Sequence, residues 1–132
     1  MRKTRLNKKA KKRTPEQIAR DKAWTVFSKY IREVRDKNIC YTCGDTTQPK
    51  NAGHFWHNVL DFDEENIHCQ CIVCNKWKSG NLAVYSVKLL NELGEERFKA
   101  LDQRHTMAMK GDKKDLKYYE DIIEKYSKLL IE

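Results

Sequence analysis

The sequence predicts an α+β domain in which helices enclose a small, metal-stapled centre. Apolar residues recur at helical spacing before residue 39 and after residue 81, whereas the stretch between them has no such period and is interrupted by glycine and proline. That central stretch also holds all five cysteines. The chain has 132 residues, of which 39% are hydrophobic and 35% are charged, so we expect one modest core that a staple would stabilise.

A basic arm precedes the expected domain. Residues 2–13 contain eight lysines or arginines and no acid, which accounts for the whole net charge of +8. Because such side chains release condensed counterions when they approach phosphates, the arm favours a polyanionic partner such as DNA. A solvated tail or a localisation signal is the alternative interpretation. No apolar run suits a membrane span or a secretory signal, so we expect a cytoplasmic protein that does not bind membranes.

Residues 14–132 are expected to form the single domain, with an amphipathic helix over 14–38 at its start. Thr14 is a suitable N-cap, Pro15 suits the first turn, and Gln17 can reach back to the cap. The apolar residues that follow recur at intervals of three and four, which predicts a helix to about residue 37.

The core over residues 39–81 is rich in turns, and we expect a hairpin there with short strands near 52–56 and 66–70. Residues 82–132 return to helical spacing. Gly94 is expected to end the first of these helices, and the last helix is expected to run from Asp112.

Four of the cysteines form two CxxC pairs, Cys40 with Cys43 and Cys71 with Cys74. A two-residue gap lets both sulfurs of a pair turn toward one ion, and two pairs complete the tetrahedral shell of a structural Zn²⁺. Such a closed shell has no open position for water, so any catalysis must occur elsewhere. Cys69 is expected to be a buried, small hydrophobic residue rather than a ligand.

The residues between and just after the two pairs include three motifs: AGHF, NIHCQC and CNKWKSGN. The arrangement resembles the HNH, or ββα-metal, nucleases in their zinc-bearing form. In that family a histidine lies on the first hairpin strand, an asparagine precedes the second CxxC by five residues, and a metal-binding histidine or asparagine follows it. His54, Asn66 and Asn75 stand at these places. From residue 20 to about 105 the chain is also similar to the NinG (Rap) recombination endonucleases of lambdoid phages.

This resemblance implies a treble-clef zinc core with a ββα-metal hairpin, flanked by long helices. It also implies a DNA endonuclease that acts on branched or recombining DNA, in the host cytoplasm if the chain is phage-encoded. His54 would be the general base, Asn66 would fix the loop that presents it, and Asn75 would give an oxygen ligand to Mg²⁺ or Mn²⁺. The residue types suit this chemistry, because a neutral imidazole can deprotonate water near pH 7 and hard ions prefer oxygen donors. Symmetric cutting of a four-way junction would favour a homodimer.

The position before His54 departs from the family pattern. Many HNH enzymes have a metal-binding Asp or His there, whereas this chain has Gly53. Substrate phosphates or another side chain would then complete the shell. We prefer His57 among the candidate side chains, which are Asn51, His57, Asp45 and Asp61.

Other interpretations of these residues remain open. His54 alone would more often be a structural histidine, and asparagines such as Asn66 and Asn75 commonly form turns or caps. Three residues beside the expected metal are candidates to hold phosphates, with a solvated helix start as the alternative: Lys76, Lys78 and Asn81.

The remaining histidines and the tryptophans outside the motif positions are interpreted more plainly. His68 is expected to be structural, and His105 is expected to be a loop or helix-end residue. Trp24 is expected in the core, whereas Trp56 and Trp77 suit core packing and stacking on unpaired bases about equally.

Two rival functions are consistent with the same sequence. One is a zinc module that binds nucleic acid without catalysis, which the glycine before His54 favours. The other is an HNH nuclease that cleaves RNA. Because His54, Asn66 and Asn75 all stand at HNH motif positions, the DNA endonuclease is our preferred prediction.

Overall fold

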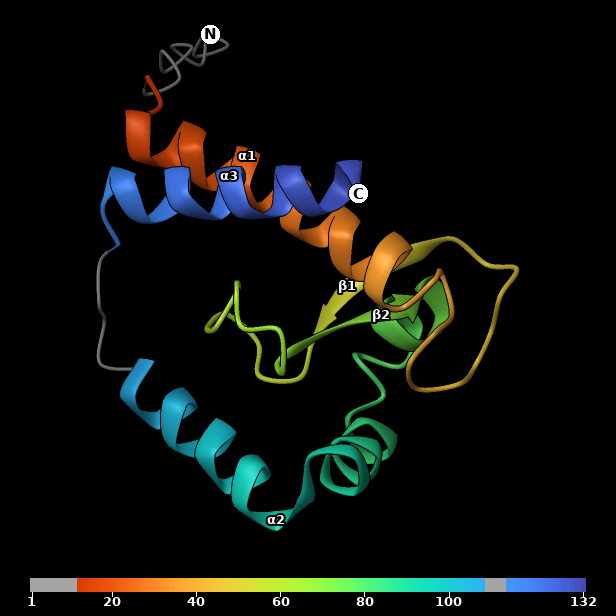
Figure 1. Ribbon diagram of the computed structural model, residues 1–132. Coiled ribbons are helices and arrows are strands. Elements are labelled where there is room, and N and C mark those ends of the chain that lie inside the picture. The colour runs from red at the N-terminus through yellow and green to blue at the C-terminus, as the bar shows by residue number, and fades with distance from the viewer. Residues whose placement is uncertain (1–11, 109–113) are drawn as a thin grey trace, which may run out of the picture.

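The computed structural model describes residues 12–108 and 114–132 (Figure 1). The helices and strands follow in this order: α1 (Pro15–Lys29), the π-helix η1 (Tyr30–Arg35), β1 (Lys50–His54), β2 (Ile67–Cys71), the π-helix η2 (Val73–Trp77), α2 (Leu82–Ala108) and α3 (Leu116–Ile131). Helices around one hairpin confirm the expected α+β class. The basic arm lies outside the described residues except for its last two positions.

The first helix begins as the sequence predicts. The hydroxyl of Thr14 accepts a hydrogen bond from the backbone N–H of Gln17, whose side chain accepts one from the N–H of Thr14. Pro15 lies in the first turn, where its missing N–H costs no helical hydrogen bond. The helix widens into η1 and ends slightly before the expected residue, because Lys37 and Asn38 have positive φ angles of 53° and 58°.

The hairpin is the expected antiparallel pair, but both strands are displaced from the predicted ranges of 52–56 and 66–70. β1 ends at His54 because the backbone N–H of Trp56 bonds to the side chain of Asn66 instead of to a partner strand. The start of β2 shifts to the residue after Asn66 for the same reason. Side-chain hydrogen bonding therefore decides where the ladder stops.

The C-terminal helices differ in one boundary from the prediction. Gly94 breaks α2 as expected, with φ 78° and ψ 169° inside the helix. The residue expected to start the last helix, Asp112, lies outside the described residues; α3 begins later than expected, at Leu116, because Lys114 and Asp115 are non-helical. Asp115 is the actual N-cap, and its carboxylate accepts from the backbone N–H of Tyr118. Among the described residues, no helix combines the length and apolar content that a membrane span requires.

Two small cores hold the hairpin between helical layers. α1 and α3 lie side by side on one side of it, and the two halves of α2 lie on the other (Figure 1). The first core consists of Phe27, Ile31, Ile67 and Tyr126. The second consists of Tyr85, Leu89, Leu93 and Leu101. A fully buried side chain of this size contributes roughly 1.5–3 kcal/mol, so each core alone gives modest stabilisation.

Candidate functional site

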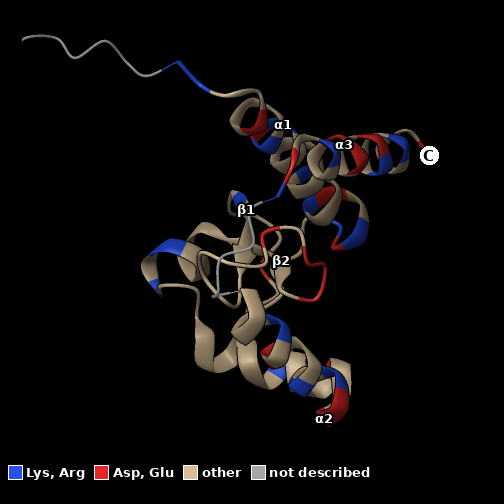
Figure 2. Ribbon diagram, turned by 90° about the vertical axis from the view of Figure 1, so that its left-hand side faces the viewer, with Lys and Arg blue, Asp and Glu red and all other residues tan. Residues whose placement is uncertain are grey.

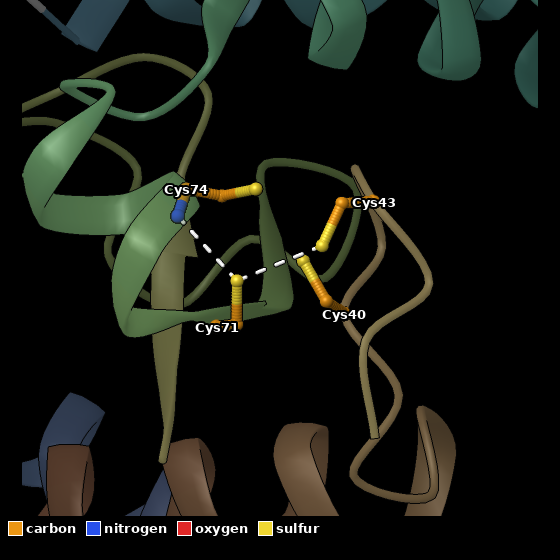
Figure 3. A group of neighbouring side chains, drawn as sticks. All are labelled: Cys40, Cys43, Cys71 and Cys74. Atoms are coloured by element: carbon orange, nitrogen blue, oxygen red, sulfur yellow. Dashed lines mark hydrogen bonds between the residues drawn. The ribbon is translucent and has the colours of Figure 1, made fainter. Parts of the chain in front are cut away.

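The four paired cysteines converge on one point (Figure 3). Cys40 and Cys43 lie in a turn before the hairpin, Cys71 ends β2, and Cys74 lies on η2. Their sulfur atoms all lie within 4.8 Å of one another, and the Sγ atoms of Cys43 and Cys71 are 3.6 Å apart. Four sulfurs at about 2.3 Å from a tetrahedral zinc ion would be separated by about 3.8 Å. The cluster therefore fits Zn²⁺ in a closed four-thiolate shell.

Cys69 is fully buried and lies outside this cluster, as expected for a small hydrophobic residue that is not one of the four ligands. The side-chain amide of Asn81 is directed at the cluster instead, with Nδ2 3.6 Å from Sγ of Cys74. The backbone N–H of Cys74 points to Sγ of Cys71 at 3.4 Å. Such N–H groups stabilise negative charge on sulfur, as thiolate ligands require.

Asp45 closes the turn that follows the first cysteine pair. Its carboxylate accepts from the backbone N–H of Gln48 at 2.7 Å and from the ammonium of Lys50 at 3.0 Å. These two hydrogen bonds lower the pKa of Asp45 to about 2. Asp45 is thus engaged in the cysteine-bearing turn and is a poor candidate for the missing catalytic ligand.

His54 lies at the end of β1 with its ring held from two directions. Nε2 is 3.0 Å from Oδ1 of Asp61, and Oδ2 of the same carboxylate accepts from Nη2 of Arg20 at 2.6 Å. The indole of Trp24 stacks on the imidazole, with ring centroids 5.3 Å apart and planes at 21°. The side chain remains 20% exposed, so the ring is both fixed and accessible.

Asn66 braces the loop that connects the two strands. It is fully buried, and its Oδ1 accepts from the backbone N–H of Trp56 at 2.8 Å. Its Nδ2 lies 3.1 Å from the carbonyl oxygen of Trp56 and 3.3 Å from those of Val59 and Leu60. One amide thus cross-links both halves of the loop that begins next to His54.

We expect Asn66→Ala to destabilise the protein by about 3 kcal/mol, because the change leaves one buried N–H and several carbonyl groups without partners. Urea unfolding followed by circular dichroism measures the effect. Asn91→Ala removes an exposed amide from α2 and serves as the matched control. Equal stability of the two variants would contradict the bracing role.

The acidic stretch of the same loop is held by arginines from two helices, η1 and α2, and it is visible as the red segment beside β2 (Figure 2). Arg104 contacts Asp63 at 2.7 Å and Glu65 at 3.1 Å, and Arg97 contacts Glu65 at 2.8 Å. Arg35 donates to two backbone carbonyls of the loop and β2 at 2.5 Å each. The carboxylates of Asp63 and Glu65 are therefore already paired with arginines and are not free to hold a cation.

His68 has the structural role that the sequence predicts. Its Nδ1 lies 2.9 Å from the hydroxyl of Tyr85, which donates to the carbonyl of Gly53 at 2.9 Å. Burial, reinforced by the positive charge of Arg35, lowers the pKa of His68 to about 3, so the ring is neutral at pH 7. This buried pair anchors α2 to the residue that precedes His54.

The glycine before His54 has a packing cause. A Cβ at Gly53 would lie only 1.9 Å from Oε1 of Gln70. Gln70 is fully buried, and its Nε2 donates to the carbonyl of Gly80 at 2.8 Å and to Oγ1 of Thr42 at 3.2 Å. The space that a metal-binding side chain at Gly53 would need is thus occupied by an amide that ties β2 to the turn after η2.

His57 lies between His54 and that turn. The rings of the two histidines are 6.4 Å apart between centroids, and a Cβ at Gly80 would lie 3.3 Å from Nε2 of His57. Asn75 follows Cys74 inside η2 and is half-buried; it is not the N-cap of that helix. The structure therefore brings His57 against the turn after η2, with its ring centroid 6.4 Å from that of His54, and places Asn75 on η2 itself.

The residues that follow Asn75 are turned toward solvent. Lys76 and Lys78 are exposed, and the side chain of Trp77 between them is 80% exposed. The other two tryptophans stack on histidines. Trp56 stacks on His105 with ring centroids 3.8 Å apart and planes at 11°, and Trp24 stacks on His54. Trp77 is thus the tryptophan that remains available for stacking on a ligand.

A cavity of about 1000 Å³ lies between α1, the loop and α3. Arg20 and Asp61 line it, but His54 does not. The cavity therefore adjoins the support of His54 rather than the reactive face of the ring.

Sequence reasoning missed three partners of the site: Arg20, Gln70 and Tyr85. Arg20 and Tyr85 lie in helical stretches whose periodic pattern explains them as ordinary surface and core residues. Asp61 was considered only as a metal ligand, whereas both its oxygens bind side chains. A pairing between Arg20 and Asp61 leaves no local sequence signal.

Fold and site together define a small α+β domain with a four-cysteine, zinc-type cluster beside a hairpin that carries an accessible histidine. A family model described as "Bacteriophage Lambda NinG protein" matches residues 1–131. The chain belongs to this NinG family.

Similar proteins include the NinG protein of Escherichia phage 933W, which is 44% identical over 82 residues, or 58% of this chain and 40% of that protein. The NinG proteins of Escherichia phage lambda and Salmonella phage P22 are each 42% identical with the same coverage. The match thus spans two-fifths of the length of these relatives. No solved structure matches the chain.

Proposed function

We propose that the protein is a metal-dependent DNA endonuclease of the HNH type, with a treble-clef core stapled by structural zinc. The proposal rests on the position and contacts of the His54 side chain. An accessible imidazole ends β1, and the loop next to it is braced by Asn66. In that loop His57 lies near the His54 ring and against Gly80, which follows the second cysteine pair. The positions of His54 and Asn66 are consistent with the roles that the HNH resemblance implies for them.

His54 would act as the general base that takes a proton from the attacking water. Its Nε2 is engaged by Asp61, which leaves Nδ1 as the basic atom of the neutral ring. Asn66 keeps the loop, and with it Asp61, in place. A divalent ion bound beside the phosphate would supply positive charge and help the 3′ oxygen to leave.

Mg²⁺ or Mn²⁺ would be held by Asn75 and His57. The acids considered as alternatives are engaged elsewhere: Asp45 with Lys50, and Asp61 with Arg20 and His54. His57 is exposed and lies on the side of the loop that faces the turn after η2. The amide oxygen suits both ions, whereas an imidazole nitrogen is a better ligand for Mn²⁺ than for Mg²⁺, which is held in proteins almost wholly through oxygen.

DNA would approach over η2 and the turn that follows it. Lys76 and Lys78 offer ammonium groups to phosphates, and Trp77 offers an exposed ring to an unpaired base. Asn81 was expected among these contacts, but its amide is directed at Cys74. The preference for branched or recombining DNA derives from the NinG resemblance.

We expect the double variant Lys76→Ala, Lys78→Ala to weaken DNA binding roughly tenfold and to reduce the salt slope of the binding constant by about 2, one for each phosphate contact. Fluorescence anisotropy at several salt concentrations measures both. Lys117→Ala, Lys128→Ala makes the same charge change on exposed positions of α3. Equal salt slopes for the two double variants would contradict a DNA path over η2.

Incubation of the zinc-loaded protein with end-labelled DNA tests the proposed activity. Cleavage that requires Mg²⁺ or Mn²⁺ is expected on four-way and forked DNA, with less cleavage of linear duplex. Intact substrate under all conditions would favour the non-catalytic binding module. Faster cleavage of a matched RNA at equal salt would favour the RNA nuclease.

A further inference from the structure

Asp61 is bound on both of its oxygens by side chains from different parts of the chain. Oδ1 lies 3.0 Å from Nε2 of His54, and Oδ2 accepts from the guanidinium of Arg20 at 2.6 Å. The hydrogen bond with His54 is the main cause that lowers the pKa of Asp61. The carboxylate is therefore an anionic acceptor toward both partners.

The backbone around Asp61 is held in a conformation that a free loop would avoid. Leu60, directly before it, has a φ of 54°, which is uncommon for a bulky residue. Nδ2 of Asn66 lies 3.3 Å from the carbonyl of Leu60 and so fixes this peptide. Strained backbone at Leu60, directly before the residue that contacts His54, indicates that the loop conformation is maintained in order to position the Asp61 carboxylate.

We infer that Asp61, oriented by Arg20, is a positioning residue that fixes the tautomer and direction of the His54 ring. The anionic Asp61 accepts a hydrogen bond from Nε2–H of His54, so the lone pair of the neutral ring lies on Nδ1. Trp24 restrains the same ring by stacking. The catalytic consequence rests on the proposed nuclease function, whereas the tautomer does not.

The Arg20 contact makes Asp61→Asn a sharp test. Arginine can only donate hydrogen bonds, so the new amide would turn its oxygen to Arg20 and its NH₂ group to His54. Nε2 must then accept, and the ring proton moves to Nδ1. The substitution keeps the shape of the side chain but inverts the tautomer of His54.

The experiment records long-range ¹H–¹⁵N correlations of the zinc-loaded protein without a second divalent ion, at a pH where His54 is neutral. Wild type is expected to show Nε2 protonated, and Asp61→Asn is expected to show Nδ1 protonated. Glu65→Gln, an acid-to-amide change on the same loop whose carboxylate binds only arginines, should keep the wild-type tautomer. An unchanged tautomer in Asp61→Asn overturns the inference.

Kinetics add the second measurement. Asp61→Asn is expected to lower kcat for DNA cleavage by about 10²- to 10⁴-fold with little change in KM, and Glu65→Gln is expected to leave both unchanged. If wild type shows no cleavage but Asp61→Asn inverts the tautomer of His54, the positioning role of Asp61 stands and the nuclease proposal fails. If Asp61→Asn does not fold, the wild-type spectrum still decides, because a ring protonated at Nδ1 would overturn the inference.

Discussion

Cys74→Ser is expected to leave the protein largely unfolded at 25 °C. The four sulfurs lie within 4.8 Å of one another and connect the turn before the hairpin, the end of β2 and η2. A structural zinc site contributes an apparent free energy of about 10–16 kcal/mol in small zinc domains, whereas whole domains are stable by only about 5–15 kcal/mol. Two separate small cores cannot compensate for its loss. Circular dichroism and the zinc content of the purified protein measure the effect.

Cys69→Ala is the matched control for this variant. Cys69 is equally buried but lies outside the cluster, so we expect a loss of about 1 kcal/mol and full zinc content. Chelation of zinc from the wild-type protein should reproduce the unfolding seen with Cys74→Ser. A Cys74→Ser protein with wild-type helicity and melting temperature would show that the thiolate cluster is dispensable for the fold.

His54→Ala is expected to reduce DNA cleavage by about 10²- to 10⁴-fold, the usual contribution of a general base. The fold should survive, because the ring is at the edge of the hairpin and 20% exposed. Single-turnover cleavage of a labelled DNA junction with saturating Mn²⁺ measures the chemical step. Added imidazole is expected to restore part of the rate, since it can occupy the space beside Trp24 and Asp61.

His105→Ala provides the control for this substitution. His105 lies outside the hairpin and stacks on Trp56, so its loss removes an imidazole without touching the proposed base. We expect cleavage close to wild type. Cleavage by His54→Ala at the wild-type rate would remove His54 from the mechanism.

The sequence was informative where local rules operate. The capping box at Thr14 follows from side chains three residues apart, and Gly94 breaks α2 because glycine tolerates a positive φ. The pairing of the cysteines follows from the spacing of two CxxC motifs. The turn-rich segment between the helical stretches predicted a hairpin in the right part of the chain, with each strand one or two residues away from its expected range.

The sequence was less informative where long-range contacts decide. The strand ends depend on the side chain of Asn66, which bonds to backbone groups across the loop. The role of Gly53 depends on Gln70, a residue on the opposite strand whose amide fills the space. Asp61 meets Arg20 across 41 residues of sequence, where α1 packs beside the hairpin. Such contacts have no periodic pattern that a single sequence displays.

We propose that a second divalent ion is held beside His54 at a site separate from the zinc. Anomalous scattering from crystals grown with Mn²⁺ and a short DNA fork tests it most directly. We predict zinc at about 2.3 Å from the four cysteine sulfurs, and manganese at about 2.1 Å from His57 and Asn75 with a phosphate facing Nδ1 of His54. Manganese elsewhere, or DNA bound with its phosphates away from that ring, would contradict the account.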